Sequence, residues 1–373
     1  MGQKTKKKIR MKSGDFLMAV LVLALVVFGI IMVFSASYYS SISETGDPYT
    51  YLKDDIKWAL LGAGLMLITS LIDYRLYGKL APLLLISSLV LLILLFTPLG
   101  ITRNYATRWL GVGGITLMPG EVAKICAIIF VAWFLSRDPK RIRSLTKGVL
   151  PLILLCGVFF FLIIKQPNLS TAITICAIII GMMFVAGLNI MYLITVAVMG
   201  GGGILTLALM DDEGYWLKRI TSFMDPFQDP LGSGWQVIQS LLALGSGGLF
   251  GVGLGKSIQK TLYLPEPQND FILSIIGEEL GFAGCLALII CYIVLIWRGS
   301  HIALNAPDLF GTLIAAGITI MLAVQVILNI AVVTSSMPPT GITLPFVSYG
   351  GNALLLFMGS FGILLNISRH SAL

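Results

Sequence analysis

The side chains of this sequence that could do chemistry are a few carboxylates, cations and hydroxyls set among apolar residues. Asp270 follows the segment 264–269, in which Pro265 and Pro267 favour extended backbone and oppose a helix. We therefore expect Asp270 at the N-cap of the apolar helix that follows, where a carboxylate accepts backbone N–H bonds. A carboxylate at the boundary of lipid and water could instead act as a general base. The residues alone leave both roles open.

Glu278 and Glu279 belong to the same apolar run. They follow Asp270 by eight and nine residues, which places them about 12–13 Å deeper along a continuous helix. Carboxylates inside a membrane are unfavourable and usually face a cavity or a partner. Adjacent helical residues point about 100° apart, so the two cannot share one target. They either support the site or pair with backbone groups or a basic residue.

Glu121 and Lys124 are spaced three residues apart, so they share one face of a helix that begins near residue 119. Such a pair can simply neutralise two charges within a membrane. If it faces a polar cavity, the ammonium could bind a phosphate group while the carboxylate sets its position. Arg108 and Trp109, in the preceding outer loop, add a cation and an interfacial aromatic ring suited to a lipid head group.

The composition places these groups at a membrane. Only 12% of the 373 residues are charged, whereas soluble domains carry about 25%. The mean hydropathy is +0.93, so a water-soluble globular protein is excluded. Two histidines and five cysteines leave little basis for a His-built metal site, and the cysteines sit in apolar runs as reduced packing residues. The glycine-rich run 245–256 does not follow a strand as a phosphate loop would, and we expect no organic cofactor and no nucleic-acid partner.

Ten apolar runs are long enough to cross a membrane as helices. A spanning helix needs about 20 apolar residues, because its backbone groups must bond to one another within the hydrocarbon. The sequence therefore predicts an all-α integral membrane protein with ten transmembrane helices. The expected spans are 16–36, 56–72, 76–96, 117–135, 148–164, 171–187, 190–209, 271–297, 309–333 and 344–367.

The distribution of Lys and Arg sets the expected orientation. These residues gather in alternate connecting segments, most densely in 4–12 and 137–147. Because cytoplasmic segments carry the excess of such residues, we expect both termini in the cytoplasm. Residues 1–15 then form a basic cytoplasmic N-terminus, 16–367 a single membrane domain and 368–373 a cytoplasmic tail. A large extracellular loop is expected at 210–270, between the seventh and eighth helices.

A series of short motifs follows one another along the chain. They are Arg108-Trp109-Leu110, Pro119-Gly120-Glu121-Val122-Ala123-Lys124, Gln166-Pro167-Asn168-Leu169, Asp225-Pro226-Phe227, Gln239-Ser240, Leu264-Pro265-Glu266, Asp270-Phe271-Ile272, Gly277-Glu278-Glu279-Leu280-Gly281 and Pro345-Phe346-Val347-Ser348-Tyr349-Gly350-Gly351. Together they strongly resemble the SEDS family, which comprises the FtsW, RodA and SpoVE proteins. The resemblance covers about 16–367, and 251–281 is closer to FtsW and SpoVE than to RodA.

This resemblance implies a peptidoglycan glycosyltransferase that polymerises lipid II at the outer face of the bacterial cytoplasmic membrane, in division, shape maintenance or sporulation. It also implies ten helices with both ends cytoplasmic and a class B penicillin-binding protein as partner. Asp270 matches the catalytic acid of the family, and Asn168 stands where the family usually has Asp. The residues expected to bind substrate are Arg108, Trp109, Glu121, Lys124, Gln239 and Ser348, with Glu278 and Glu279 as possible support.

In the expected reaction, a sugar 4-hydroxyl attacks the anomeric carbon of a growing chain and displaces undecaprenyl pyrophosphate. Asp270 would take the proton. Lys124, Arg108 or a divalent cation (Mg²⁺ or Mn²⁺) would stabilise the leaving pyrophosphate. Two other functions stay open: a lipid II flippase, and a non-catalytic scaffold that recruits a penicillin-binding protein. The position of Asp270 at the membrane surface favours the enzyme.

Overall fold

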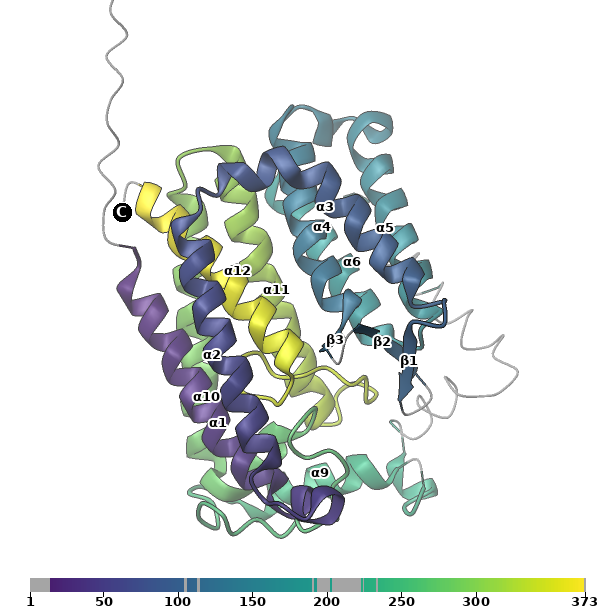
Figure 1. The fold of residues 1–373 in the computed structure, drawn as a ribbon, viewed down its shortest axis with the longest axis vertical. Coiled ribbons are helices and arrows are strands. Elements are labelled where there is room, and N and C mark those ends of the chain that lie inside the picture. Colours follow the sequence, from purple (N-terminus) through teal and green to yellow (C-terminus); the bar gives the residue numbers. More distant parts are fainter. Residues whose placement is uncertain are drawn as a thin grey trace, which may run out of the picture.

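The computed structural model describes residues 14–103, 106–112, 115–189, 191–192, 202, 223, 225–232 and 234–371. Long helices run side by side, and a small sheet, several loops and helix α9 lie toward the end opposite the C-terminus (Figure 1). The elements are α1 Phe16–Thr45, α2 Thr50–Leu71, α3 Arg75–Leu94, β1 Gly100–Arg103, β2 Ala106–Val112, β3 Ile115–Leu117, α4 Pro119–Ser136, η1 Arg141–Arg143, η2 Leu145–Val149, α5 Leu150–Ile164, α6 Leu169–Val185, η3 Pro226–Gln228, α9 Trp235–Ser246, α10 Ile272–Leu304, α11 Leu309–Val333 and α12 Gly351–His370.

The helices follow the apolar runs of the sequence. Within the described residues, seven are long and apolar enough to cross a membrane, namely α1, α3, α4, η2 with α5, α10, α11 and α12. The expected second and sixth spans correspond to α2, which begins with several charged residues, and to the shorter apolar helix α6. The expected seventh span, 190–209, and the start of the expected large loop, 210–222, lie almost entirely outside the described residues.

A three-stranded antiparallel sheet separates α3 from α4, so the expectation of an all-α chain is wrong at this point. Ile101 of β1 pairs with Trp109 of β2, and Leu110 of β2 pairs with Leu117 of β3. Its Thr, Ile, Trp and Val residues favour strands, but the strands are too short to be seen in a search for spanning helices. The sheet matters because β2 carries Arg108.

The last helix starts later than expected. We expected a span from residue 344, but α12 begins at Gly351 and the residues before it form a buried, non-helical segment. Pro345 cannot donate a backbone hydrogen bond, and the Ser348 hydroxyl accepts one from Leu344 N at 2.8 Å, which closes a turn instead. The segment 344–350 therefore belongs to the loops around the polar end of the bundle.

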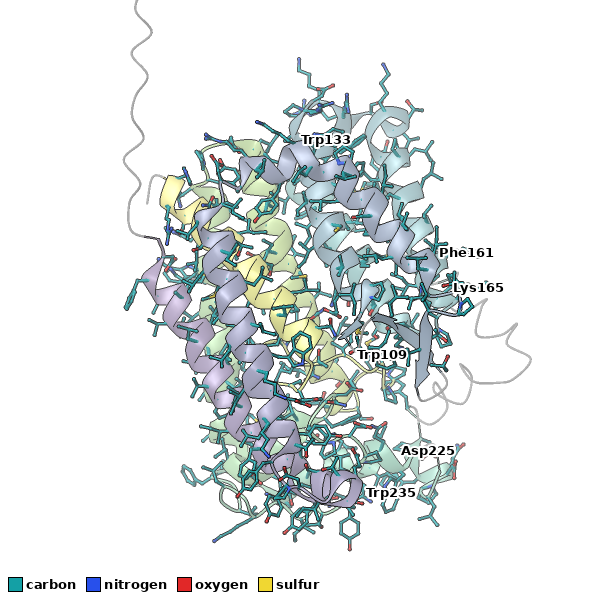
Figure 2. The ribbon with its side chains drawn as sticks, viewed as in Figure 1. Trp109, Trp133, Phe161, Lys165, Asp225 and Trp235 are labelled. Atoms are coloured by element: carbon teal, nitrogen blue, oxygen red, sulfur yellow. The ribbon has the colours of Figure 1, made fainter. Side chains whose placement is uncertain are left out.

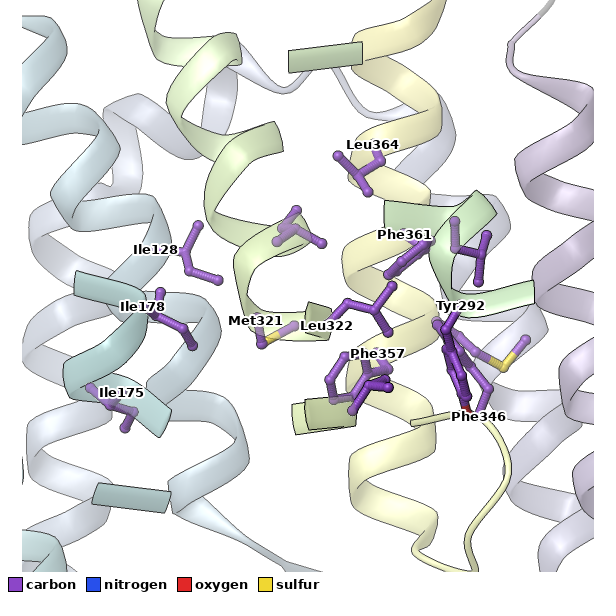
Figure 3. Close-up of a cluster of buried hydrophobic side chains, with 14 of the residues drawn as sticks. Ile128, Ile175, Ile178, Tyr292, Met321, Leu322, Phe346, Phe357, Phe361 and Leu364 are labelled. Carbon is purple, nitrogen blue, oxygen red and sulfur yellow. The ribbon is translucent and has the colours of Figure 1, made fainter. Parts of the chain in front are cut away.

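Aromatic residues anchor this segment in the core. The Phe346 ring lies 5.6 Å from Phe357 and 5.0 Å from Phe361, both in edge-to-face geometry. The Tyr292 hydroxyl donates to Pro345 O at 2.6 Å. Figure 3 shows Tyr292, Phe346, Phe357 and Phe361 gathered in one part of the buried cluster. Paired rings of this kind add about 0.5–1.5 kcal/mol beyond their burial, so the loop base is fixed to α10 and α12.

Helix α10 is not a straight span. Gly281 interrupts it with φ +70° and ψ −168°, and a Cβ on Gly277 would lie only 3.4 Å from Cys285 Sγ. The short arm before Gly281 therefore folds sharply against the long arm after it. The segment 248–253 bonds to the backbone on both sides of this turn, for example Val252 N to Glu278 O at 2.9 Å and Phe282 N to Gly248 O at 2.9 Å.

The two ends of the described chain meet at one end of the bundle. Arg298 Nη2 lies 2.7 Å from Asp15 Oδ2, and Ser368 Oγ accepts a hydrogen bond from Asp15 N at 3.0 Å. Trp133 lies toward this end in Figure 2, whereas Asp225 and Trp235 lie at the opposite end. The small sheet, helix α9 and the loops near them lie toward the end of the bundle away from the termini (Figure 1).

Candidate functional site

Asp270 lies in the segment that leads into α10, and two other segments hold its backbone. Asn329 Nδ2, from α11, donates to Asp270 O at 2.8 Å. Tyr349 N, from the loop before α12, donates to Gln268 O at 2.9 Å. The expected N-cap role is wrong, because the N-cap of α10 is Phe271 and no side chain caps the helix. The Asp270 side chain therefore does not cap the N-terminus of this helix.

The Asp270 carboxylate and the Arg108 guanidinium face one point at Gly341. A Cβ added to Gly341 would lie 3.4 Å from Asp270 Oδ2 and 3.7 Å from Arg108 Nη1. Gly341 has φ +79°, which L side chains rarely adopt. Three segments distant in the sequence thus bring a carboxylate and a guanidinium close to Gly341, a residue that has no side chain.

Arg108 is held by the turn that precedes α6. Its Nη2 donates to Pro167 O. The next residue, Asn168, caps α6 by accepting from Thr171 N at 3.3 Å and from Ser170 Oγ at 3.0 Å. Asn168 thus supplies a neutral N-cap at the position where the resemblance implied an Asp. The turn that orients Arg108 is formed here without a charge.

Glu121 and Lys124 form an enclosed ion pair at the start of α4. Lys124 Nζ lies 2.7 Å from the Glu121 carboxylate, and the two residues are only 2% and 7% exposed. The ammonium also lies 5.8 Å from the centre of the Phe357 ring, in α12. A Cβ added to Gly120 would lie 3.1 Å from Thr171 Cγ2, so α4 begins close to the start of α6, and the pair is not open to solvent.

The other expected substrate-binding residues have mixed placements. Trp109 follows Arg108 in β2, where it pairs with Ile101 of β1. Gln239 is buried in α9, next to Ser240. Ser348 is buried and its oxygen already accepts the Leu344 N–H, so its observed contact is within the loop. Contact of these residues with a substrate stays a prediction.

Glu278 and Glu279 face different targets, as the helical geometry predicts. The Glu278 carboxylate accepts from the Ser257 hydroxyl, from Ile258 N at 2.8 Å and from Gln259 N at 3.3 Å. Glu279 accepts from Lys260 Nζ at 2.7 Å and from Ser35 Oγ at 2.8 Å. Pairing with backbone groups and a basic residue is therefore what the structure contains. Both lie in the short arm of α10, between Ile272 and Gly281.

Sequence reasoning missed Asn329, Gly341 and the partner of Glu279. Asn329 had a signal: it is a buried amide four residues after Gln325 in an otherwise apolar helix, and polar groups in a span usually have a partner. Gly341 and Lys260 had none, because their roles depend on contacts with residues far away in the sequence.

The described residues do not form an evident metal site. No group of three or more His, Cys, Asp or Glu side chains comes together among them, whereas Mg²⁺ and Mn²⁺ prefer oxygen ligands such as carboxylates.

We expect Glu266→Gln to remove a pH dependence of stability. Partial burial, and then the Glu44 charge, raise the pKa of Glu266 above 4.5. For a carboxyl whose folded pKa is raised, stability is full below the unfolded pKa and is lost as the pH rises through the folded pKa. Thermal melts should show a higher Tm for Glu266→Gln than for wild type at pH 8 and equal values at pH 4. A constant difference at both pH values would contradict this assignment.

Gly281→Ala should strongly destabilise the fold. A Cβ there would overlap the backbone nitrogens of Gly251 and Phe250, in addition to the positive φ. Overpacking and backbone strain each cost about 1–3 kcal/mol. The matched control is Gly157→Ala in α5, where nothing lies within 4 Å of the added carbon. Thermal melts in detergent should show a large loss for the first variant and almost none for the second, and equal melts would show that the turn is not tightly packed.

Apolar spanning helices with a carboxylate and a guanidinium facing one point define a multi-pass membrane protein with a polar site at one end of its bundle. The family FTSW_RODA_SPOVE, described as "Cell cycle protein", matches residues 15–373. The chain belongs to this family.

Relatives and solved structures agree with this membership. Stage V sporulation protein E of Bacillus subtilis is 43% identical over 360 residues, which are 96% of this chain and 98% of that protein. The probable peptidoglycan glycosyltransferase FtsW of Trichlorobacter lovleyi is 41% identical over 368 residues, 97% and 95% of the two chains. The structure is similar to Thermus thermophilus RodA (TM-score 0.71, 27% identity, 97% and 98% covered) and to a chain of a peptidoglycan synthase complex that coordinates polymerization and crosslinking (TM-score 0.79, 27% identity, 96% and 98% covered).

Proposed function

We propose that this chain is a peptidoglycan glycosyltransferase that polymerises lipid II into glycan strands. The observation that carries the proposal is the meeting of the Asp270 carboxylate and the Arg108 guanidinium at Gly341. The names of its relatives support the reaction class, since several are probable peptidoglycan glycosyltransferases. A carboxylate base and a guanidinium cation close to one point match the needs of sugar transfer to a hydroxyl.

The reaction joins the 4-hydroxyl of the acceptor sugar to the anomeric carbon of the growing chain. The bond from that carbon to undecaprenyl pyrophosphate breaks, and the hydroxyl proton goes to the Asp270 carboxylate. A positioned base contributes about 10²–10⁴-fold to such a step. Arg108 faces the same point and stabilises the negative charge of the leaving pyrophosphate. Lys124 is less suited to this role, because it is 2% exposed and already paired with Glu121.

The site would face the outside of the cytoplasmic membrane. The proposal keeps ten spans, both termini in the cytoplasm and the large loop outside. Its support is that the two ends of the described chain meet at one end of the bundle, and that the basic segment 137–147 lies between spans expected to close on that side. Cytoplasmic segments carry such excess charge, so Asp270 and Arg108 would lie at the outer end.

A class B penicillin-binding protein is the proposed partner. The support is the likeness to a chain of a peptidoglycan synthase complex. Polymerised strands must then be crosslinked, so a transpeptidase at the outer face would receive the product directly.

Purified protein in detergent, supplied with lipid II, tests this function. Wild type with its class B partner should produce a ladder of glycan strands on a gel. Wild type that makes no strands under these conditions, yet moves lipid II across the bilayer of reconstituted vesicles, would identify a flippase instead. Strands that also form without the class B partner would show that the partner is not needed.

A further inference from the structure

Asn329 is a buried amide that joins two segments, the one that contains Asp270 and the one that contains Gly341 and Ile342. It lies in α11 and is 0% exposed. Its Nδ2 donates to Asp270 O at 2.8 Å and to Ile342 O at 2.7 Å. Both hydrogens of the amide are therefore used on backbone carbonyls, one from each segment. Two such bonds fix the orientation of the amide plane.

These two carbonyls belong to the segments that carry the Asp270 carboxylate and Gly341. Asp270 carries the carboxylate, and Ile342 directly follows Gly341, the point that Asp270 Oδ2 and Arg108 Nη1 face. The Asn329 side chain therefore links the backbone of the proposed base directly to the residue after Gly341. A second tie, Tyr349 N to Gln268 O at 2.9 Å, holds the same two segments. If Asn329 were lost, the segments would stay together at that tie while Asp270 could move.

Helix α11, which carries Asn329, is itself held in place by buried hydrogen bonds. One turn after Asn329, Val333 O accepts from Ser240 Oγ at 2.8 Å, and Ser240 Oγ lies 2.8 Å from Ser274 Oγ in α10. All three of these residues are buried. The end of α11 is thus bonded to α9 and through it to the arm that follows Asp270. Sites held by side chains on rigid elements keep their geometry better than sites on loops alone.

We propose that Asn329 is a positioning residue for the transfer reaction, and this inference rests on the proposed function. The amide holds Asp270 and Gly341 at the spacing in which the carboxylate reaches the acceptor hydroxyl, and it does not touch the substrate itself. A displacement of about 1 Å can reduce a reaction rate by about 10²-fold. Loss of Asn329 should therefore lower kcat and leave binding of lipid II almost unchanged.

The variant Asn329→Leu, which keeps most of the volume and removes both donors, tests this role. Its matched control is Asn366→Leu in α12, another buried amide, whose Nδ2 donates to Ser70 O at 2.9 Å far from the site. Both variants are purified with the partner protein and melted before the assay. We expect similar losses of Tm, a fall in kcat of about 10–100-fold with KM within about threefold for Asn329→Leu, and kcat close to wild type for Asn366→Leu. Equal kcat for the two variants would overturn the inference.

A second variant keeps the test decisive if Asn329→Leu does not fold. In Asn329→Asp, the ionised carboxylate cannot donate to either carbonyl, whereas the protonated form can donate to one. Its rate divided by that of wild type should therefore rise as the pH falls, and a constant ratio would overturn the inference. Wild type and Asp270→Asn are run in the same assay, so that a failure of the proposed function can be told from a failure of the positioning role. If wild type makes no strands, the proposed function fails. If wild type makes strands and Asn329→Leu is as active as wild type, the positioning role fails while the proposed function stands.

Discussion

Asp270→Asn is expected to reduce the rate of lipid II polymerisation by about 10²–10⁴-fold, the usual contribution of a positioned general base. The amide keeps the size of the side chain and cannot take the hydroxyl proton. Two hydrogen bonds that hold this segment, Asn329 Nδ2 to Asp270 O and Tyr349 N to Gln268 O, do not involve the carboxylate, and a melt run beside the assay measures the stability of the variant. The helix α10 is also not capped by this side chain. Tm should therefore stay close to that of wild type.

Two further variants make this result specific. Asp54→Asn removes an exposed carboxylate that pairs with Lys57, and it should polymerise at the wild-type rate. Asp270→Glu keeps a carboxylate and moves it by about one methylene group, so it should retain part of the activity. Equal loss in Asp270→Asn and Asp54→Asn would show a general effect of charge, in disagreement with the proposed base.

Lys124→Met is expected to destabilise the protein by about 3–5 kcal/mol, because removal of one partner leaves the Glu121 carboxylate buried without compensation. The pair is almost fully enclosed, with side-chain exposures of 3% and 9%. The double variant Glu121→Leu with Lys124→Met should recover much of the stability, since an apolar pair of similar volume needs no compensation. Thermal or chemical melts in detergent measure each step.

The surface pair of Lys53 and Asp47 is the control. Its N–O distance is also 2.7 Å, but the side chains are 61% and 41% exposed, and exposed pairs contribute about 0–1 kcal/mol. Lys53→Met should therefore change stability very little. If Lys124→Met melted like wild type and still lost polymerisation, the pair would act on the substrate and not on the fold.

The sequence predicted the parts that depend on local patterns. Apolar length predicted most helices, and the few charges within or next to them pointed to Asp270, Glu121 and Lys124. The motifs identified the family before any contact was known. These features are visible because burial of a charge or exposure of backbone in a membrane is strongly unfavourable wherever it occurs.

The remaining features depend on contacts between distant segments. The turn at Gly281 depends on hydrogen bonds to the segment 248–253. The non-helical segment 344–350 depends on the packing of Phe346 against Phe361. The meeting of Arg108, Gly341 and Asp270 needs a sheet, a loop and a helix entry to converge. A helical period cannot show any of these, and so Asp270 was placed as a cap that the structure does not form.

The most direct measurement follows glycan strand length over time, with purified chain and class B partner in detergent, where no second compartment exists for transport. The account predicts a growing ladder from wild type and only unreacted lipid II from correctly folded Asp270→Asn. A ladder that grows at the wild-type rate in Asp270→Asn would contradict it.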